Sequence, residues 1–177
     1  PFLCLFMSCF YVLSEFCHKG KYRTINKQET KGYRVKMNTN NKCEFSVYVD
    51  GWKTITSTST LSLSSWNHIV VANKTDQQLI YINGALDISG SEGEYDVNDD
   101  SEMYIGSNRA SEYFTGNMYD FRYYNIKLLD VDISQIYRTN VVIGNEILYL
   151  LFSRDDPRTA TYHSSVGDVS NVLNIGV

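Results

Sequence analysis

Short apolar segments recur at regular intervals between residues 66 and 124, and this spacing constrains the fold more than any other feature. Residues 66–72 and 79–83 are separated by a polar turn, and residues 103–106 and 116–124 follow an acidic loop. Several short strands with turn residues between them are typical of antiparallel sandwiches, whereas parallel strands need long crossover connections. We therefore expect two antiparallel sheets packed face to face.

Two residue pairs predict tight hairpins in this arrangement. Asp50-Gly51 separates residues 43–49 from a Ser- and Thr-rich segment, and Asn83-Gly84 is followed by a short partner strand at 85–88. Both pairs suit type I′ turns, which need left-handed backbone at their two central positions. Alternation within residues 43–49 assigns three side chains to one face: Cys43, Phe45 and Val47.

Residues 128–138 break the two-residue period and predict one short helix. Leu129, Ile133, Ile136 and Tyr137 are spaced i, i+4, i+7 and i+8, which places them on one helical face. Asp130 or Asp132 is expected to cap the helix. A helix this short is marginal alone, so it must pack on the sandwich.

The two ends of the chain leave alternatives open. Residues 2–13 are almost wholly apolar but too short to span a bilayer as a helix. We prefer a strand buried on both faces to the remnant of a signal-peptide core. Residues 146–153 have a buried-strand pattern, and residues 140–177 either close the sandwich or open a further module. We favour closure, which makes residues 1–177 a single domain.

Composition excludes some partners and chemistries. The net charge is −4 and the 16 Lys and Arg residues are scattered, so we expect no nucleic-acid partner. The cysteines form no C-x-x-C pair, so a structural zinc site is not expected. Disulfides or buried thiols both remain open, and Cys17 with Cys43 is the first pairing to test. The four cysteines are Cys4, Cys9, Cys17 and Cys43.

The order of motifs resembles a known family. W-x-H-h-h-h begins at Trp66, h-Y-h-N-G ends at Gly84, h-x-h-G ends at Gly106, and F-x-G-x-h-x-D-h-R-h-Y begins at Phe114. This order resembles the laminin-G-like jelly rolls, which are concanavalin A-like and pentraxin-related, most clearly over residues 31–138. The resemblance implies an all-β antiparallel sandwich with one short helix near 128–138. It also implies that His68 is a packing residue.

Catalysis is not expected. Related jelly-roll glucanases carry carboxylates at alternating positions of one strand, in an E-x-D-x-x-E-like pattern, so that an acid and a nucleophile flank a sugar bond. The nearest candidate is the run from Glu92 to Asp96, which Gly93 interrupts and turn residues flank. We interpret it as a solvated acidic loop. The histidines combine with no G-x-S-x-G motif either.

The same acidic loop is a candidate calcium site. Calcium takes six to eight oxygen ligands from flexible loops, and the resemblance implies a calcium site on a rim loop. The alternative is an acidic loop held open by charge repulsion, since the spacing is not that of an EF-hand. The candidate ligands are Asp96, Asn98, Asp99 and Asp100.

Aromatic and planar polar side chains are candidates for carbohydrate binding. An exposed ring stacks on a sugar face, and amide or guanidinium groups bond its hydroxyls. The candidates are Trp52, Tyr95, Asn108, Arg109 and Tyr113. Trp66 is instead assigned to the core. Asn73 heads the N-glycosylation sequon Asn73-Lys74-Thr75, which we place in a turn.

The sequence therefore predicts a non-catalytic recognition or adhesion module that binds a glycan or a protein. We expect no membrane span, and an extracellular or surface location. The alternative is a structural or decoration component of a larger assembly, such as a virion or extracellular coat, joined to neighbouring subunits. A glycoside hydrolase is the third interpretation, which the interrupted carboxylate pattern disfavours.

Overall fold

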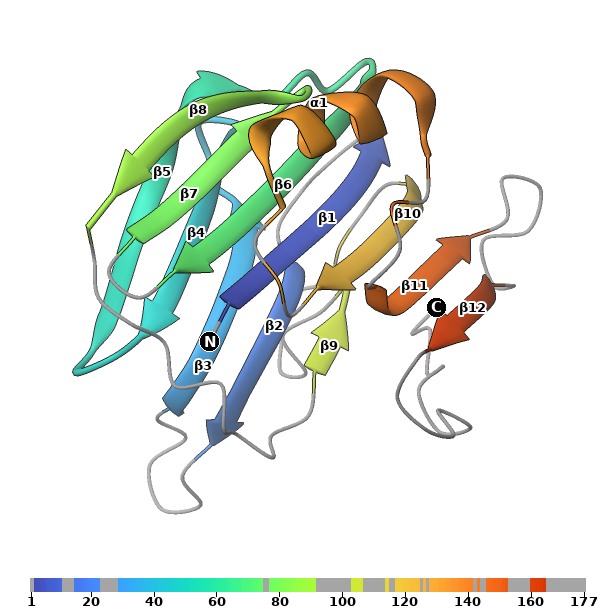
Figure 1. Cartoon of the computed structure of the whole chain (residues 1–177). Helices are drawn as coiled ribbons and strands as arrows, with labels where there is room; N and C mark the ends of the chain where they lie inside the picture. Colours follow the sequence, from blue (N-terminus) through green and yellow to red (C-terminus); the bar gives the residue numbers. More distant parts are fainter. Residues whose placement is uncertain are drawn as a thin grey trace.

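The fold is seen in a computed structural model of the chain (Figure 1). It describes residues 2–10, 15–22, 29–74, 77–91, 103–106, 114, 117–124, 126, 128–141, 143, 146–152 and 160–164. For residues 2–31, 74, 146–152 and 160–164 the description is of the backbone alone.

Two antiparallel sheets pack face to face, as the sequence predicts. One has seven strands in the order β12-β11-β10-β1-β6-β7-β8, and the other has five in the order β5-β4-β3-β2-β9. The helix lies over the seven-stranded sheet, and the five-stranded sheet lies behind it in Figure 1. The elements are β1 Phe2–Phe10, β2 Glu15–Tyr22, β3 Glu29–Met37, β4 Lys42–Tyr48, β5 Trp52–Thr60, β6 Trp66–Lys74, β7 Gln77–Ile82, β8 Ala85–Gly90, β9 Met103–Ile105, β10 Asn117–Tyr124, α1 Asp130–Thr139, β11 Glu146–Phe152 and β12 Ala160–Ser164.

Both ends of the chain contribute strands to the larger sheet. The apolar N-terminal segment forms β1, which pairs with β6 on one side and β10 on the other. The tail forms β11, which pairs with β10, and β12, which pairs with β11. The tail therefore extends the sheet of the preceding strands, and a further module beginning within 165–177 would lie outside the described residues.

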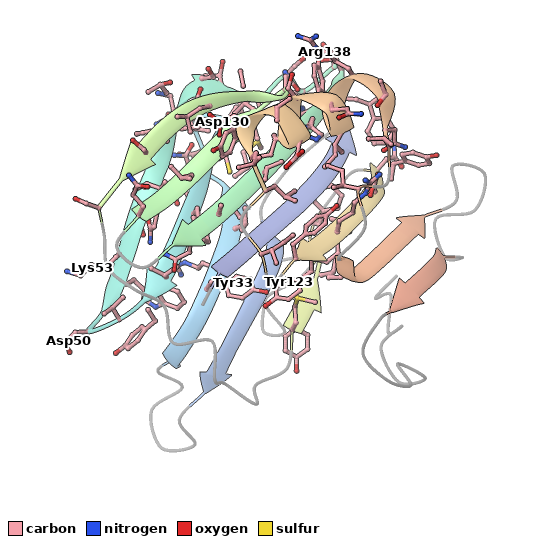
Figure 2. The ribbon with its side chains drawn as sticks, in the orientation of Figure 1. Tyr33, Asp50, Lys53, Tyr123, Asp130 and Arg138 are labelled. Carbon is pink, nitrogen blue, oxygen red and sulfur yellow. The ribbon has the colours of Figure 1, made fainter. Side chains whose placement is uncertain are left out.

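The core between the sheets follows the two-residue alternation of the strands. Cys43, Phe45 and Val47 of β4 are fully buried, as predicted, and face apolar residues of β6, β7 and β10. Figure 2 labels Tyr33 of β3, which belongs to this core, and Tyr123 of β10, which is partly buried and packs against it. The burial of these apolar side chains between the sheets is the main contribution to the stability of the fold.

Cys43 adopts the second of the two alternatives that the sequence leaves open, the buried thiol. It takes part in no disulfide bond. Cys17 pairs in register with Val35 of β3, and Cys43 lies on the far side of β3 in β4. Strands two apart in a sheet are about 9–10 Å from each other, which exceeds the separation that a disulfide bridges.

Both predicted hairpins are present. Asn83 and Gly84 have φ angles of 52° and 79°, the left-handed pair that a type I′ turn requires. The Asn83 side chain also accepts a hydrogen bond from the backbone N–H of His68 at 3.0 Å. Gly51 has a φ of 111° in the turn between β4 and β5, but Asp50 has no positive φ, so this hairpin lacks the left-handed pair of the type I′ turn that the sequence predicts.

Replacing Gly84 by Ala should lower the free energy of unfolding by about 2 kcal/mol or more. A Cβ at this position would lie 2.8 Å from Cδ1 and 2.9 Å from Cβ of Tyr137, and the left-handed φ adds strain. Urea denaturation followed by circular dichroism measures the change. Gly51→Ala is the matched control, because its φ is also positive but its Cβ would meet nothing within 4 Å. Equal losses for both variants would show that the contact with Tyr137 contributes nothing.

The helix α1 begins later, and presents a different face, than the sequence predicts. Its N-cap is Leu129, and Asp132 accepts the Leu129 N–H at 3.0 Å, so an aspartate supports the first turn without being the cap residue. Ile133 and Ile136 are buried as predicted. Leu129 and Tyr137 are 60% and 48% exposed, which corrects their assignment to the buried face. Leu128, just before the helix, is buried in their place.

A second apolar cluster joins the helix to the outer face of the seven-stranded sheet. Val70, Leu79 and Tyr81 of the sheet pack against Ile133 and Ile136 of the helix. Tyr81 also donates a hydrogen bond from its hydroxyl to Asp130 at 2.8 Å. Sheet strands β6 and β7 are thus covered on both faces, which explains their nearly continuous apolar sequence.

Trp66 is not a core residue, which corrects the prediction. Its side chain is 43% exposed at the first position of β6, and its indole packs edge-on against the Tyr119 ring at 6.2 Å. Side chains alternate between the two faces of β6, and Trp66, like His68, is on the face that points away from the sheet interface. His68 is buried at 4% exposure beside Tyr137, in agreement with its expected packing role.

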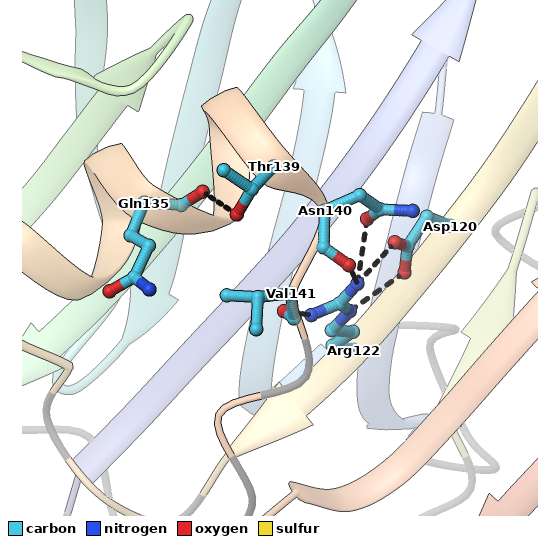
Figure 3. A network of polar contacts seen from close by, with 6 residues as sticks. All are labelled: Asp120, Arg122, Gln135, Thr139, Asn140 and Val141. Atoms are coloured by element: carbon cyan, nitrogen blue, oxygen red, sulfur yellow. Dashed lines mark hydrogen bonds and ion pairs between the residues drawn. The ribbon is translucent and has the colours of Figure 1, made fainter.

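A buried ion pair fixes the chain as it leaves the helix (Figure 3). Arg122 binds both carboxylate oxygens of Asp120, at 3.0 and 2.8 Å, and both side chains are almost fully buried. It also donates to the Asn140 side chain at 2.7 Å and to the Val141 carbonyl at 2.6 Å. Burial alone lowers the pKa of Arg122, but the hydrogen bonds and charge of Asp120 outweigh burial and raise it.

Candidate functional site

The outer face of the five-stranded sheet carries a row of residues that crosses all five strands. Hydrogen-bond register places Tyr104 of β9 beside His18 of β2, His18 beside Arg34 of β3, Arg34 beside Ser46 of β4, and Ser46 beside Thr54 of β5. Directly opposed residues of a sheet share one face, and the described side chains of this row are those of Tyr104, Arg34, Ser46 and Thr54. Five strands at about 4.8 Å spacing give a row about 19 Å long, which suits an extended ligand.

Aromatic residues hold the guanidinium of Arg34 in place. Its Cζ lies 4.5 Å from the ring centroid of Trp52, so the cation rests on one face of the indole. Tyr48 packs edge-on against the same indole, with centroids 5.5 Å apart. All three side chains are half-buried. The stack depends on the Asp50-Gly51 hairpin, which brings Trp52 opposite Tyr48; Figure 2 labels Asp50 at this end of the sheet.

Hydroxyl groups lie beneath and beside this cation. Nε of Arg34 donates to Oγ of Ser46 at 3.4 Å, and Oγ of Ser46 lies 2.8 Å from Oγ1 of Thr54. Ser46 is fully buried under the guanidinium, whereas Thr54 is exposed at the edge strand. The face thus combines aromatic surface, a planar cation and hydroxyls, which together can bond and stack against a hydroxyl-rich ligand.

The carboxylate on this face, Glu44, is fully engaged by its neighbours. Its Oε1 accepts from Nδ2 of Asn38 at 2.9 Å, and its Oε2 lies 3.7 Å from Nζ of Lys36. A glycosidase needs two carboxyl groups about 5–10 Å apart, one as acid and one as base or nucleophile. Among the side chains that the structure describes on this face, Glu44 has no such second carboxylate.

Side chains from the other sheet seal the edge next to this face. Asp87 of β8 accepts the backbone N–H groups of Thr58 and Ser59 in the edge strand β5, at 2.6 and 3.0 Å. Gln78 of β7 donates to the Lys53 carbonyl at 3.3 Å. The hydrogen bonds lower the pKa of Asp87, although burial alone raises it. These bonds occupy backbone groups that an added strand would need.

The predicted site residues fall in three places. Trp52 lies on the outer face, where one side of its ring supports Arg34 instead of being open to a sugar. The other predicted ligand-binding residues and the calcium loop lie outside the described residues: Tyr95, Asn108, Arg109, Tyr113, Asp96, Asn98, Asp99 and Asp100. Asn73 is in β6, where it pairs with Gln78 of β7, and is 2% exposed, so its placement in a turn is wrong.

The burial of Asn73 disfavours the expected glycan, because attachment needs an accessible amide. Glycosylation itself remains a prediction. In the described part of the chain, no three His, Cys, Asp or Glu side chains gather to hold a metal ion. That finding does not extend to the predicted calcium loop, which stays an expectation. No helix among the described residues has the length and apolar character to cross a bilayer.

Sequence reasoning missed Arg34, Ser46 and Thr54 as site residues. Alternation within residues 43–49 places Ser46 on the face opposite the core residues Cys43, Phe45 and Val47. Alternation within one segment does not give the register between β3, β4 and β5. This register places Arg34 over Trp52. No single segment signals this contact, because Arg34 and Trp52 lie in β3 and β5, which are separated by β4.

Comparison with known families agrees with this architecture. A family profile described as the concanavalin A-like lectin/glucanases superfamily matches residues 15–134. A search of curated protein sequences gave no match. The family resemblance stated from the sequence is therefore confirmed.

Solved structures of the same fold are similar at low sequence identity. A native heptameric SAP-like pentraxin from Limulus polyphemus is 14% identical with a TM-score of 0.61, over 81% of this chain and 73% of the pentraxin. The Ruminococcus gnavus IT-sialidase CBM40 bound to α2,3-sialyllactose is 13% identical with a TM-score of 0.60, over 77% and 82%. Domain 4 of the extracellular GH43 arabinanase AbnA from Geobacillus stearothermophilus, in complex with arabinotriose, is 12% identical with a TM-score of 0.63, over 77% and 66%.

Proposed function

The chain belongs to the concanavalin A-like lectin/glucanases superfamily, and from that premise we propose that it is a non-catalytic module that binds glycans. The binding surface is the outer face of the five-stranded sheet. The observation that carries this proposal is the stack of Arg34 on Trp52 beside Tyr48, next to the Ser46 and Thr54 hydroxyls. Aromatic surface and orienting polar groups on a rigid sheet are what a sugar needs.

Two further observations support a binding role over catalysis. Glu44 is engaged by Lys36 and Asn38, and the described side chains of this face supply no second carboxyl group to act with it. Similar structures include modules solved with sialyllactose and with arabinotriose. Both belong to enzymes that act on carbohydrates, and in both the similar part is a separate module. We place this chain in the same non-catalytic class, at an extracellular or otherwise exposed surface.

The structural alternative has less support. A coat or decoration component would join its neighbours through surfaces such as sheet edges. Asp87 and Gln78 instead occupy backbone groups of the edge strand β5. Calcium remains part of the proposal only through the loop containing Asp96 and Asp99. A chelator that abolishes glycan binding would support a role for that loop.

Replacing Trp52 by Ala should weaken glycan binding about ten-fold or more. The substitution removes the aromatic support of Arg34 and the partner of Tyr48, and an aromatic contact with its ordered cation contributes about 1–2 kcal/mol. The measurement is the binding of the fluorescent protein to a printed glycan array, followed by calorimetry with the oligosaccharide that binds best. Urea denaturation of the variant shows whether it remains folded.

Trp66→Ala is the matched control, since Trp66 is the second tryptophan and lies on the other sheet. Its binding should stay within about two-fold of the unaltered protein, because its loss removes no contact on the proposed face. Stronger loss in Trp66→Ala than in Trp52→Ala would move the site to the helix-bearing sheet. Failure of the unaltered protein to bind any glycan on the array would refute the proposed function.

A further inference from the structure

Arg34 lies at the centre of the row of site residues and carries a positive charge. Nε of Arg34 binds Ser46, and its guanidinium plane rests on Trp52. Among the side chains that the structure describes, no carboxylate forms an ion pair with Arg34. An arginine has five N–H donors, so the two terminal nitrogens can each offer two to a ligand.

Two other charged side chains on this face pair with each other. Lys36, two residues along β3, pairs with Glu44 at 3.7 Å. The second oxygen of Glu44 is taken by Asn38. Glu44 is therefore committed on the side away from the Arg34–Trp52 stack, and among the described side chains next to this stack the positive charge is that of Arg34. The chain as a whole has a net charge of −4, so attraction of an anion must be local.

The guanidinium is held in place before a ligand arrives. The Trp52 ring supports it from one side, and its Nε donates to the Ser46 hydroxyl, which is itself bonded to Thr54. An arginine ordered before binding loses less conformational entropy when a ligand arrives. Its paired N–H groups match the two oxygens of a carboxylate or of a sulfate group.

We propose that the ligand of this face is an anionic glycan whose carboxylate or sulfate group is bound by Arg34. The proposal rests on the proposed function, because it assigns a chemical class to the same site. The neutral part of the glycan lies along the row toward Thr54 on one side and Tyr104 on the other. Arg34 is the residue that sets specificity, and Trp52 and Ser46 are positioning residues.

A glycan array with matched cores tests this proposal. Each neutral oligosaccharide core is printed beside its sialylated, uronate-bearing and sulfated derivatives. The unaltered protein should bind anionic derivatives at least about ten-fold more tightly than their neutral cores, the amount expected for hydrogen bonds to a charged group. The relative signals of the carboxylate and sulfate derivatives identify which anion fits. Raising the salt concentration should weaken binding to the anionic derivatives.

Variants of Arg34 assign the preference to this residue. Arg34→Gln should lose the discrimination between anionic and neutral members, and Arg34→Lys should keep part of it, because it retains the charge but not the paired donors. Arg138→Gln, at an exposed arginine in the last turn of α1, should behave as the unaltered protein. If Arg34→Gln fails to fold, the Lys variant and the salt dependence of the unaltered protein decide the question.

The outcomes separate this proposal from the function on which it rests. Equal or tighter binding to the neutral cores, unchanged in the Arg34 variants, overturns the anionic ligand and leaves the glycan-binding module standing. A loss of neutral and anionic binding by the same factor in Arg34→Gln also overturns it, because Arg34 would then be a general contact. No binding by the unaltered protein to any member overturns both.

Discussion

Replacing Arg122 by Met should lower the free energy of unfolding by about 3–5 kcal/mol. The change leaves the Asp120 carboxylate buried without its cation, and leaves the Asn140 side chain and the Val141 carbonyl without their donor. These bonds join β10 to the chain just after α1, so the loss should also loosen the helix. Urea denaturation, followed by circular dichroism and by tryptophan fluorescence, measures the change.

The double variant Asp120→Leu with Arg122→Met separates two causes of the lost stability: the unpaired buried charge of Asp120 and the lost packing of Arg122. Removing both partners takes away the unpaired buried charge, so this variant should be more stable than Arg122→Met alone. Arg138→Met makes the same substitution at an exposed site and should change stability by less than about 0.5 kcal/mol. If Arg122→Met is no less stable than Arg138→Met, the network in Figure 3 does not stabilise the fold.

The sequence predicts the strands and turns because their causes are local. Alternation in residues 43–49 places Phe45 in the core, and Asn83-Gly84 adopts the left-handed pair that only a few residues accept. The apolar run in β6 indicates burial on both faces. Such signals are contained within a few neighbouring residues, so no knowledge of the rest of the fold is needed to interpret them.

The errors arise where burial depends on distant partners. Trp66 is apolar enough for the core, but its phase in β6 and its position at the strand start leave it against Tyr119 near the surface. Tyr137 shares a helical face with Ile133 and Ile136, yet the helix ends over the Asn83-Gly84 turn and leaves the ring half exposed. Element type is set locally, whereas the covering of each face is set by packing.

In the candidate site, too, residue types can be predicted locally but their contacts depend on distant partners. The sequence predicts Trp52 as a ligand-binding residue because an exposed aromatic ring can stack on a sugar. Its partner Arg34 is 18 positions earlier, and their contact exists only because β3, β4 and β5 pair in one register. That register also converts Trp52 from an open stacking platform into the support of a cation. Functional chemistry here arises from pairing between strands, which no single segment encodes.

Lowering the pH from 6.5 to 5 should destabilise the protein by about 1.5–2 kcal/mol through His68 alone. Burial, and then the nearby charge of Arg122, lower the pKa of His68 from 6.5 to about 3. The imidazole therefore stays neutral in the folded protein, while the unfolded chain takes up a proton below pH 6.5. Stability is complete above pH 6.5 and falls as the pH drops toward 3.

His68→Phe should remove this part of the pH dependence. The phenyl ring keeps a contact with Tyr137 but cannot take up a proton, so the free energy of unfolding should fall less between pH 6.5 and 5. Urea denaturation at several pH values measures both proteins. The other histidines, His18 and His163, are present in each and cancel in the difference. This window lies above the usual pKa values of Asp and Glu, so carboxylates contribute little. Parallel pH profiles for the two proteins would mean that His68 is protonated, or hydrated, in the folded state.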